Sequence, residues 1–232
     1  MGMYTSDILQ VRDSFEGFSS GQRVGWLSPL VSAPLVQPPP VVSLREPFVG
    51  LRETLFFSDL VRIAFIQRGG FDRPGFGTID SSLPYSNSEG SHANIVQPTK
   101  SFDTKFYKNA LGMETAPFGE AHDSGDELPT QVALRLDSGQ LFRVERLRAP
   151  ECPTGLLQVY SPYFDAPDYR EISRPGYMGL SLYCFQVSDL ACVVESLNRE
   201  GAQNLVTEFN EFGESSCLFV APDGYTWCIT GE

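Results

Sequence analysis

The stretch that decides the fold is FDTKFYKNALGM, which runs from Phe102 to Met113. Its apolar residues recur at the spacing of one helical face, which predicts a short amphipathic helix. Ser101 lies just before it and is a suitable N-cap, because its hydroxyl can accept from backbone N–H groups of the first turn. Gly112 predicts the end of the helix, since glycine readily adopts the left-handed conformation of a helix stop.

Strands are predicted on both sides of this helix. Ala93–Gln97 is a short strand before it. Glu114–Phe118, Gln131–Leu136 and Leu141–Leu147 follow it, and the apolar stretch Leu156–Tyr160 adds one more strand. The predicted order is therefore one strand, one helix and a run of strands.

The same order recurs further along the chain. Leu180–Val187 predicts a strand, and Ser188 or Asp189 can cap a helix whose apolar residues, from Leu190 on, fall on one face. Gly201 predicts the end of that helix. Three more strands are predicted, at Asn204–Phe209, Ser216–Val220 and Tyr225–Thr230. An internal repeat of this kind indicates two copies of one supersecondary unit.

Three strings resemble modules of the vicinal oxygen chelate superfamily, the group of the glyoxalases, bleomycin-resistance proteins and extradiol dioxygenases. They are FDTKFYKNALGM, with its FY pair followed by LG, then FQVSDLACVVESLNREGA (Phe185–Ala202), then CLFVAPDGYTWCITGE (Cys217–Glu232). The resemblance covers the chain from about His92 to its last residue. It implies an α+β fold, in which paired βαβββ modules form an open, cupped β-barrel.

The resemblance divides the chain into four parts. Residues 92–163 are the first βαβββ module and residues 164–232 the second. Residues 76–91, which are rich in Gly, Ser, Pro and Asp without any period, are predicted to form a loop. Residues 1–75 are an extra, mainly β region that includes the hairpin Leu51–Gln67 and could be an incomplete module.

The resemblance also implies a cleft that can hold a divalent ion such as Fe, Zn, Ni or Mn, with ligands from the first and last strands of each module. His92 matches the first-strand position of the first module. Counting from the last turn of the chain gives Cys228 as another ligand. The same count in the first module gives Arg143, with Glu145 on the same strand face, and Gln158 if the additional strand takes that role.

The implied metal ligands are His92, Glu145 and Cys228, and Glu145 and His92 are the implied catalytic groups. Glu145 would be a base or a ligand, with a pKa raised by a partly apolar cup. Plainer readings stay open, since His92 could be a loop histidine and Cys228 a small buried side chain. In the second module the first-strand position falls on Leu182 or Ser181, neither of which is a ligand.

Aromatic and cationic residues gather around the linker between the two modules. Tyr160 and Tyr183, with Arg143 and Gln158, are candidates to bind a planar or carboxylate-bearing small molecule. The alternative is that these aromatic rings pack the linker against the sheet.

Three functions are compatible with these features. The first is a metal-assisted isomerase, lyase or dioxygenase acting on a small oxygenated or aromatic molecule. The second is a metal-free protein that binds a small molecule, as the bleomycin-resistance branch does. The third is a structural partner, because the hairpin edge at Leu51–Gln67 invites pairing in a homodimer.

Composition limits which partners and which cell compartment are expected. A net charge of −12 disfavours binding to nucleic acid or to an anionic membrane surface. Met1–Asp13 lacks the pattern of a signal peptide, and no stretch is long and apolar enough to span a membrane. Five cysteines without a CxxC pair suggest reduced thiols in the cytoplasm. The second of the two histidines, His122, lies in a polar stretch that is predicted to be a solvated loop.

Overall fold

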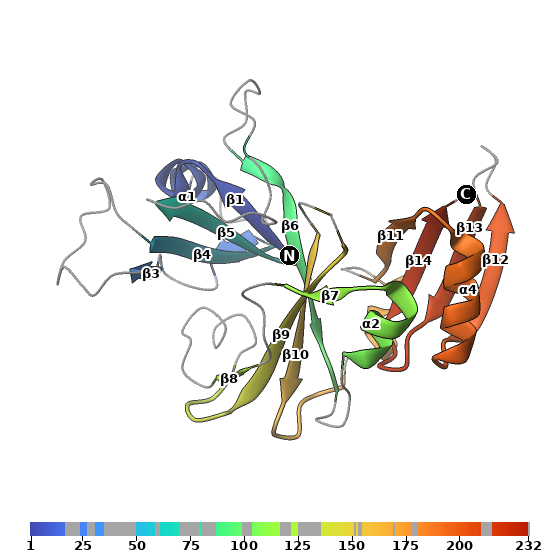
Figure 1. Ribbon diagram of the computed structural model, residues 1–232. Coiled ribbons are helices and arrows are strands. Elements are labelled where there is room, and N and C mark those ends of the chain that lie inside the picture. The colour runs from blue at the N-terminus through green and yellow to red at the C-terminus, as the bar shows by residue number, and fades with distance from the viewer. Residues whose placement is uncertain are drawn as a thin grey trace. The chain divides into compact units, whose positions relative to one another are not determined.

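A computed structural model describes most of the chain and divides it into two compact units (Figure 1). The described residues are 1–16, 24–26, 31–34, 50–58, 61–69, 79, 87–98, 104–116, 122–124, 136–150, 152, 155–168, 170–177, 181–209 and 215–231. The first unit comprises Met1–Asn94, Ser124–Gln140 and Glu151–Gln158, and the second comprises Ile95–Asp123, Leu141–Pro150 and Val159–Glu232.

The first unit contains a mixed sheet in the strand order β2-β4-β5-β1-β6, with β3 paired to β4. Its elements are β1 (Gly2–Thr5), α1 (Ile8–Glu16), β2 (Val24–Trp26), β3 (Val31–Pro34), β4 (Gly50–Ser58), β5 (Val61–Gly69) and the greater part of β6 (Asn87–Val96). The first strand, β1, runs parallel to the last strand of the region, β5, and antiparallel to β6.

Helix α1 covers one face of this sheet. Asp7 caps it, because its Oδ1 accepts from the backbone N–H groups of Leu9 and Gln10, each at 3.0 Å. Val11 on the helix packs with Phe65 on β5 in a small core cluster. Side chains of neighbouring residues point to opposite faces of a strand, so Ala64 lies on the face away from the helix.

The second unit holds the end of β6 and, beyond it, the strand order β10-β9-β7. Its elements up to the linker are α2 (Lys105–Leu111), β7 (Glu114–Thr115), β9 (Phe142–Arg148) and the greater part of β8 (His122–Ser124, which pairs with β9) and of β10 (Leu156–Pro162). The predicted helix stop is confirmed, since Gly112 has φ +65°.

A four-stranded sheet in the order β11-β14-β13-β12 completes the second unit. After the short 3-10 helix η1 (Glu171–Ser173), its elements are β11 (Tyr183–Val187), α4 (Leu190–Arg199), β12 (Gln203–Phe209), β13 (Ser215–Val220) and β14 (Thr226–Gly231). Strand β11 runs parallel to β14, as β1 does to β5. Asp189 is the cap of α4, with its Oδ1 accepting from the Cys192 backbone N–H at 2.8 Å.

The predicted α+β class is confirmed, because mixed sheets are combined with few helices among the described residues. Two local predictions are wrong. Strand β6 begins at Asn87, inside the expected loop 76–91, and β8 occupies the polar stretch around His122 that was expected to be a loop. The strand predicted at Gln131–Leu136 lies almost wholly outside the described residues.

The N-terminal region is more complete than expected. Across the sheet its strands lie in the order β1-β5-β4-β2, so that the first strand in sequence lies next to the last. The sheet β11-β14-β13-β12 has the same arrangement. Residues 92–163 therefore pair with the N-terminal region, through β6 and β1, and no pairing of β6 with β11 is found among the described residues. No helix in the described part of the chain is long and apolar enough to cross a membrane.

Candidate ligand-binding site

His92 lies on β6 in the first unit and is buried, with 7% of its surface exposed. It stands directly opposite Gly2 of β1 in the antiparallel register. A Cβ placed on Gly2 would overlap the imidazole, so the glycine leaves the space in which the ring lies. The ring therefore covers the backbone of the neighbouring strand in the centre of the sheet.

Hydrogen bonds fix the tautomer of this imidazole. The Ser91 hydroxyl donates its single proton to the Gly2 carbonyl at 3.0 Å. The same Oγ lies 3.0 Å from His92 Nδ1, and we assign it as the acceptor there, with the proton of the ring on Nδ1. In the neutral ring, Nε2 is then the acceptor and the basic nitrogen.

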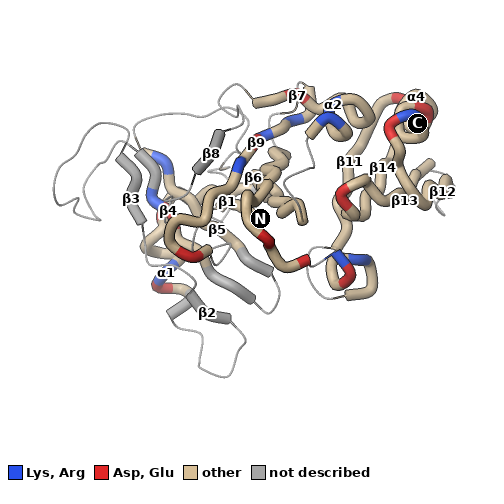
Figure 2. The backbone as a smooth tube through the Cα atoms, turned by 90° about the horizontal axis from the view of Figure 1, so that it is seen from below, with Lys and Arg blue, Asp and Glu red and all other residues tan. Residues whose placement is uncertain are grey.

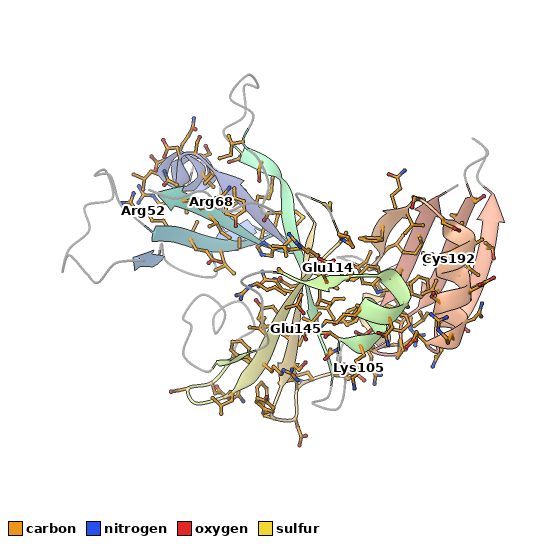
Figure 3. All side chains as sticks on the ribbon, viewed as in Figure 1. Arg52, Arg68, Lys105, Glu114, Glu145 and Cys192 are labelled. Carbon is orange, nitrogen blue, oxygen red and sulfur yellow. The ribbon has the colours of Figure 1, made fainter. Side chains whose placement is uncertain are left out.

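The residues in register with His92 on this face are small or apolar, and an aromatic ring and a cation lie two residues further on. In register, Leu55 stands opposite Ala64, and Ala64 stands opposite Gly2, so small residues lie next to the histidine. Two residues further on, Tyr4 is 2% exposed, and the Arg68 guanidinium carbon lies 4.0 Å from the centre of its ring (Figure 3). Arg68 can thus present a cation beside an aromatic ring.

Glu145 lies on β9 in the second unit, beside α2 (Figure 3). Its Oε1 accepts from Lys108 Nζ at 2.5 Å and from the Thr115 hydroxyl at 3.1 Å. Its Oε2 accepts from the Thr104 hydroxyl at 2.6 Å. The expected rise in the pKa of Glu145 is wrong: burial favours a rise, but the bonds from Lys108 and Thr104 outweigh it and lower the pKa. The carboxylate is therefore held charged by groups of α2 and β7.

A second buried acid joins the FY string to the last turn of the chain. The Tyr107 hydroxyl donates to Asp223 Oδ2 at 2.6 Å, and both side chains are buried. Burial raises the pKa of Asp223, and it also raises the pKa of Tyr107, where the charge of Asp223 adds to the effect. Trp227 packs against Tyr107, with ring centres 5.4 Å apart.

Three solved structures are similar to the chain over much of its length. A glyoxalase family protein from Bacillus cereus is similar with a TM-score of 0.51 and 17% sequence identity. The alignment covers 61% of this chain and 92% of the Bacillus cereus chain. A glyoxalase I variant from Zea mays (TM-score 0.56, 13% identity) and a candidate dioxygenase from Bacillus subtilis (0.55, 11%) each cover 99% of this chain. The chain has the vicinal oxygen chelate fold. It spans 66% of the maize chain and 60% of the Bacillus subtilis chain.

These similarities concern the fold alone, since all three identities are below 20%. No protein-family model matches the sequence. No curated protein sequence matches it either. The similarity to these structures confirms the open, cupped arrangement expected for a vicinal oxygen chelate fold. The chemistry depends on the residues of this chain.

In the structure, β10 and not β9 is the last strand of the first predicted module. Strand β10 follows β9 and lies next to β6, so the last strand carries Gln158 rather than Arg143 or Glu145. Gln158 is buried and belongs to the first unit, as His92 does. Arg143 is exposed on β9 in the second unit.

The other predicted site residues belong to the second unit. Tyr160 is buried on β10, with its ring 5.7 Å from that of Phe142. Tyr183 on β11 stacks on Trp227 at 5.1 Å, and burial raises its pKa. Cys228 on β14 stands opposite Cys184 of β11. The structure thus keeps His92 and Gln158 in one unit and places the remaining predicted residues in the other.

The fold implies a divalent ion, for which His92, Glu145 and Cys228 are the candidate ligands. Among the described residues no three His, Cys, Asp or Glu side chains are grouped as metal ligands. The oxygens of Glu145 accept three hydrogen bonds from its own unit, and burial raises the pKa of Cys228, which favours the protonated thiol over the thiolate that binds metals. The residues present therefore do not fit a resident ion held by His92, Glu145 and Cys228.

Sequence reasoning missed Gly2, Ser91 and the pair of Tyr4 and Arg68. The alternating stretch Gly2–Thr5 was a weak signal, because four residues are too few for a period to be recognised. The serine before His92 was a better signal, since a hydroxyl beside an imidazole can fix its tautomer.

Proposed function

We propose that this protein binds a small hydroxylated aromatic molecule in its first unit without the help of a metal ion. The observation that carries the proposal is the contact of Ser91 Oγ with both the Gly2 carbonyl and His92 Nδ1. We assign the proton of the ring to Nδ1 on this ground, which makes Nε2 the hydrogen-bond acceptor of the neutral imidazole. A phenol or an enol is the class of ligand that donates to such a nitrogen.

The neighbouring residues support an aromatic ligand. The imidazole lies over Gly2, and the small side chain of Ala64 and the apolar side chain of Leu55 follow in the same row. Ligand sites are commonly apolar, with a few polar groups that fix orientation. His92 and Gln158 are the buried polar groups of the first unit proposed for that task.

A second candidate function follows from the same nitrogen. A neutral imidazole with its Nδ1–H held by an acceptor is the form that can take a proton at Nε2. His92 would then be a general base in an isomerase or a lyase that removes a proton from a small oxygenated molecule. The proton would go from the substrate to Nε2, with Ser91 keeping the ring in place.

The binding function is tested with a matched pair of probes, 4-nitrophenol and 4-nitroanisole, at a pH where the phenol is neutral. Only the phenol can donate to Nε2. Replacing His92 by Phe should weaken binding of the phenol about tenfold, the effect of about 1.4 kcal/mol, and leave the anisole unchanged. The His122→Phe protein is the control, since it removes the only other histidine.

The tautomer can be measured directly. With two histidines in the chain, spectra of 15N-histidine-labelled protein contain two imidazoles, and the His92→Phe variant identifies one of them. We expect a protonated Nδ1 and an unprotonated Nε2, whose 15N resonance shifts when 4-nitrophenol is added. A protonated Nε2 in the free protein, or equal binding of the phenol by the wild type and the variant, would refute the proposal.

A further inference from the structure

Two cysteines of the second unit stand side by side on neighbouring strands. Cys184 of β11 is paired with Cys228 of β14, and the two strands run parallel in continuous register over Tyr183–Val187. Side chains at paired positions of adjacent strands point to the same face of a sheet. The two thiols therefore share one face of this sheet, and neither is part of a disulfide in the structure.

The spacing of the two strands suits a covalent bond between these thiols. Neighbouring strands of a sheet lie about 4.8 Å apart. Disulfides join residues whose Cα atoms are about 4.4–6.8 Å apart, so a pair in register meets this requirement without movement of the backbone. The two side chains also contact each other. Burial raises the pKa of the Cys228 thiol, and the adjacent Cys184 thiol, with which it forms a hydrogen bond, raises it further.

The two thiols differ in their access to solvent. Cys184 is exposed, and Cys228 is partly buried. The opposite face of the sheet is closed, because Cys217 and Ile229, which pair in register, are both fully buried. A reagent from solution therefore reaches Cys184 first, with Cys228 next to it. A solvent-accessible cysteine beside a second cysteine that can resolve it is the arrangement found in redox-sensitive pairs.

Charge indicates which class of oxidant can reach the pair. The whole chain has a net charge of −12, which repels anionic oxidants such as oxidised glutathione. The two strands supply no cation to offset this repulsion, since β11 reads YCFQV and β14 reads TWCITG, and both are tan in Figure 2. A hydroperoxide is small and neutral, so the charge of the protein does not keep it away.

We propose that Cys184 and Cys228 are a modification site, which a hydroperoxide converts into a disulfide within one chain. In the first step, the sulfur of Cys184 attacks the outer oxygen of hydrogen peroxide. The O–O bond breaks, and the thiol proton goes to the departing hydroxide. The products are a sulfenic acid on Cys184 and one molecule of water.

In the second step, the sulfur of Cys228 attacks the sulfur of the sulfenic acid. The S–OH bond breaks, and hydroxide leaves with the proton of the Cys228 thiol as a second molecule of water. The two thiols have then given two electrons to the peroxide. The disulfide joins the first and the last strand of the C-terminal module. It belongs to the second unit, whereas the proposed ligand site belongs to the first.

The test is the number of thiols that one equivalent of hydrogen peroxide removes from the reduced protein. The protein is oxidised, unfolded and labelled with N-ethylmaleimide, and its intact mass should show three labels instead of the five expected from its five cysteines. Dithiothreitol should restore all five. Cys192→Ser is the matched control, because Cys192 is also exposed but lies on α4 (Figure 3). This variant should still lose two labels.

Two further variants identify the partners, with circular dichroism to check that each is folded. Cys184→Ser should keep its remaining thiols, because the exposed member of the pair is gone. Cys228→Ser should stop at the sulfenic acid on Cys184, which dimedone traps. A wild type that keeps five labels overturns the proposal. Loss of two labels from Cys184→Ser, or a disulfide that joins two chains on a non-reducing gel, also overturns it.

Discussion

Glu145 stabilises the junction between β9 and the start of α2. Replacing it by Gln keeps the shape and removes the charge that Lys108, Thr104 and Thr115 address. The expected loss is about 1–2 kcal/mol of unfolding free energy, since Lys108 is 35% exposed and water screens part of the pair. Urea denaturation at neutral pH measures it.

The pH dependence of that loss has a definite sign. The pKa of Glu145 in the folded protein is below its ordinary value of 4.5, so its contribution is present above that value. The contribution disappears as the pH falls through the folded pKa. The difference between wild type and Glu145→Gln should therefore shrink in acid, and a constant or growing difference would contradict this assignment. Glu114→Gln, which is 54% exposed, is the control and should change stability little.

At the residue scale, the sequence predicted His92 as the polar residue of the first strand but misjudged Glu145. The reason lies in the burial of β9. Phe142 and Val144 are buried on one face, and Glu145 and Leu147 are buried on the other. With both faces buried, alternation does not tell which face meets a helix. Only the position of α2 shows that Glu145 points to it.

At the scale of elements, the hydrogen bond between Tyr107 and Asp223 ties α2 to the turn between β13 and β14. Replacing Tyr107 by Phe removes the donor from a buried carboxylate, which should lower the unfolding free energy by about 1–3 kcal/mol. Tyr177→Phe is the control, because Tyr177 is 51% exposed.

The effect of Tyr107→Phe should be larger at neutral pH than in acid. Burial raises the pKa of Asp223 above 3.8, so this group favours the folded state fully below 3.8 and loses that contribution as the pH rises through the folded pKa. Without the Tyr107 donor the pKa of Asp223 in the folded protein rises further, and more unfolding free energy is lost at neutral pH. Chemical denaturation at two pH values checks this, and an equal loss at both would refute it.

The sequence predicted most elements of the second unit because caps and stops are local signals. Gly112 ends α2, and Asp189 caps α4, as expected from their positions beside apolar helical stretches. Strand β10 was recognised, but its role as the last strand of its module was left open. Five consecutive buried residues, Leu156–Tyr160, give no alternation from which an inward face can be read.

At the scale of the whole molecule, the described residues form three modules with the same strand order, and the first was not recognised as complete. Its first strand, Gly2–Thr5, is held by pairing with residues 64–66 of β5 and with β6. Contacts between residues so distant in sequence leave no local pattern. The sequence therefore did not show that β1 is the partner of β6.

The surroundings of the candidate ligands also predict the metal content. The oxygens of Glu145 already accept three hydrogen bonds, and burial raises the pKa of the Cys228 thiol, which favours its protonated form. A resident ion needs several deprotonated donors at about 2.0–2.3 Å, and neither residue is in the state that such an ion requires. We therefore expect elemental analysis of the purified protein to find far less than one Fe, Zn, Ni or Mn per chain. EDTA should leave the thermal midpoint unchanged, because no binding energy is then removed from the folded state. The His92→Ala protein is the matched comparison, and stoichiometric metal in the wild type that is lost in this variant would show that His92 is a ligand after all.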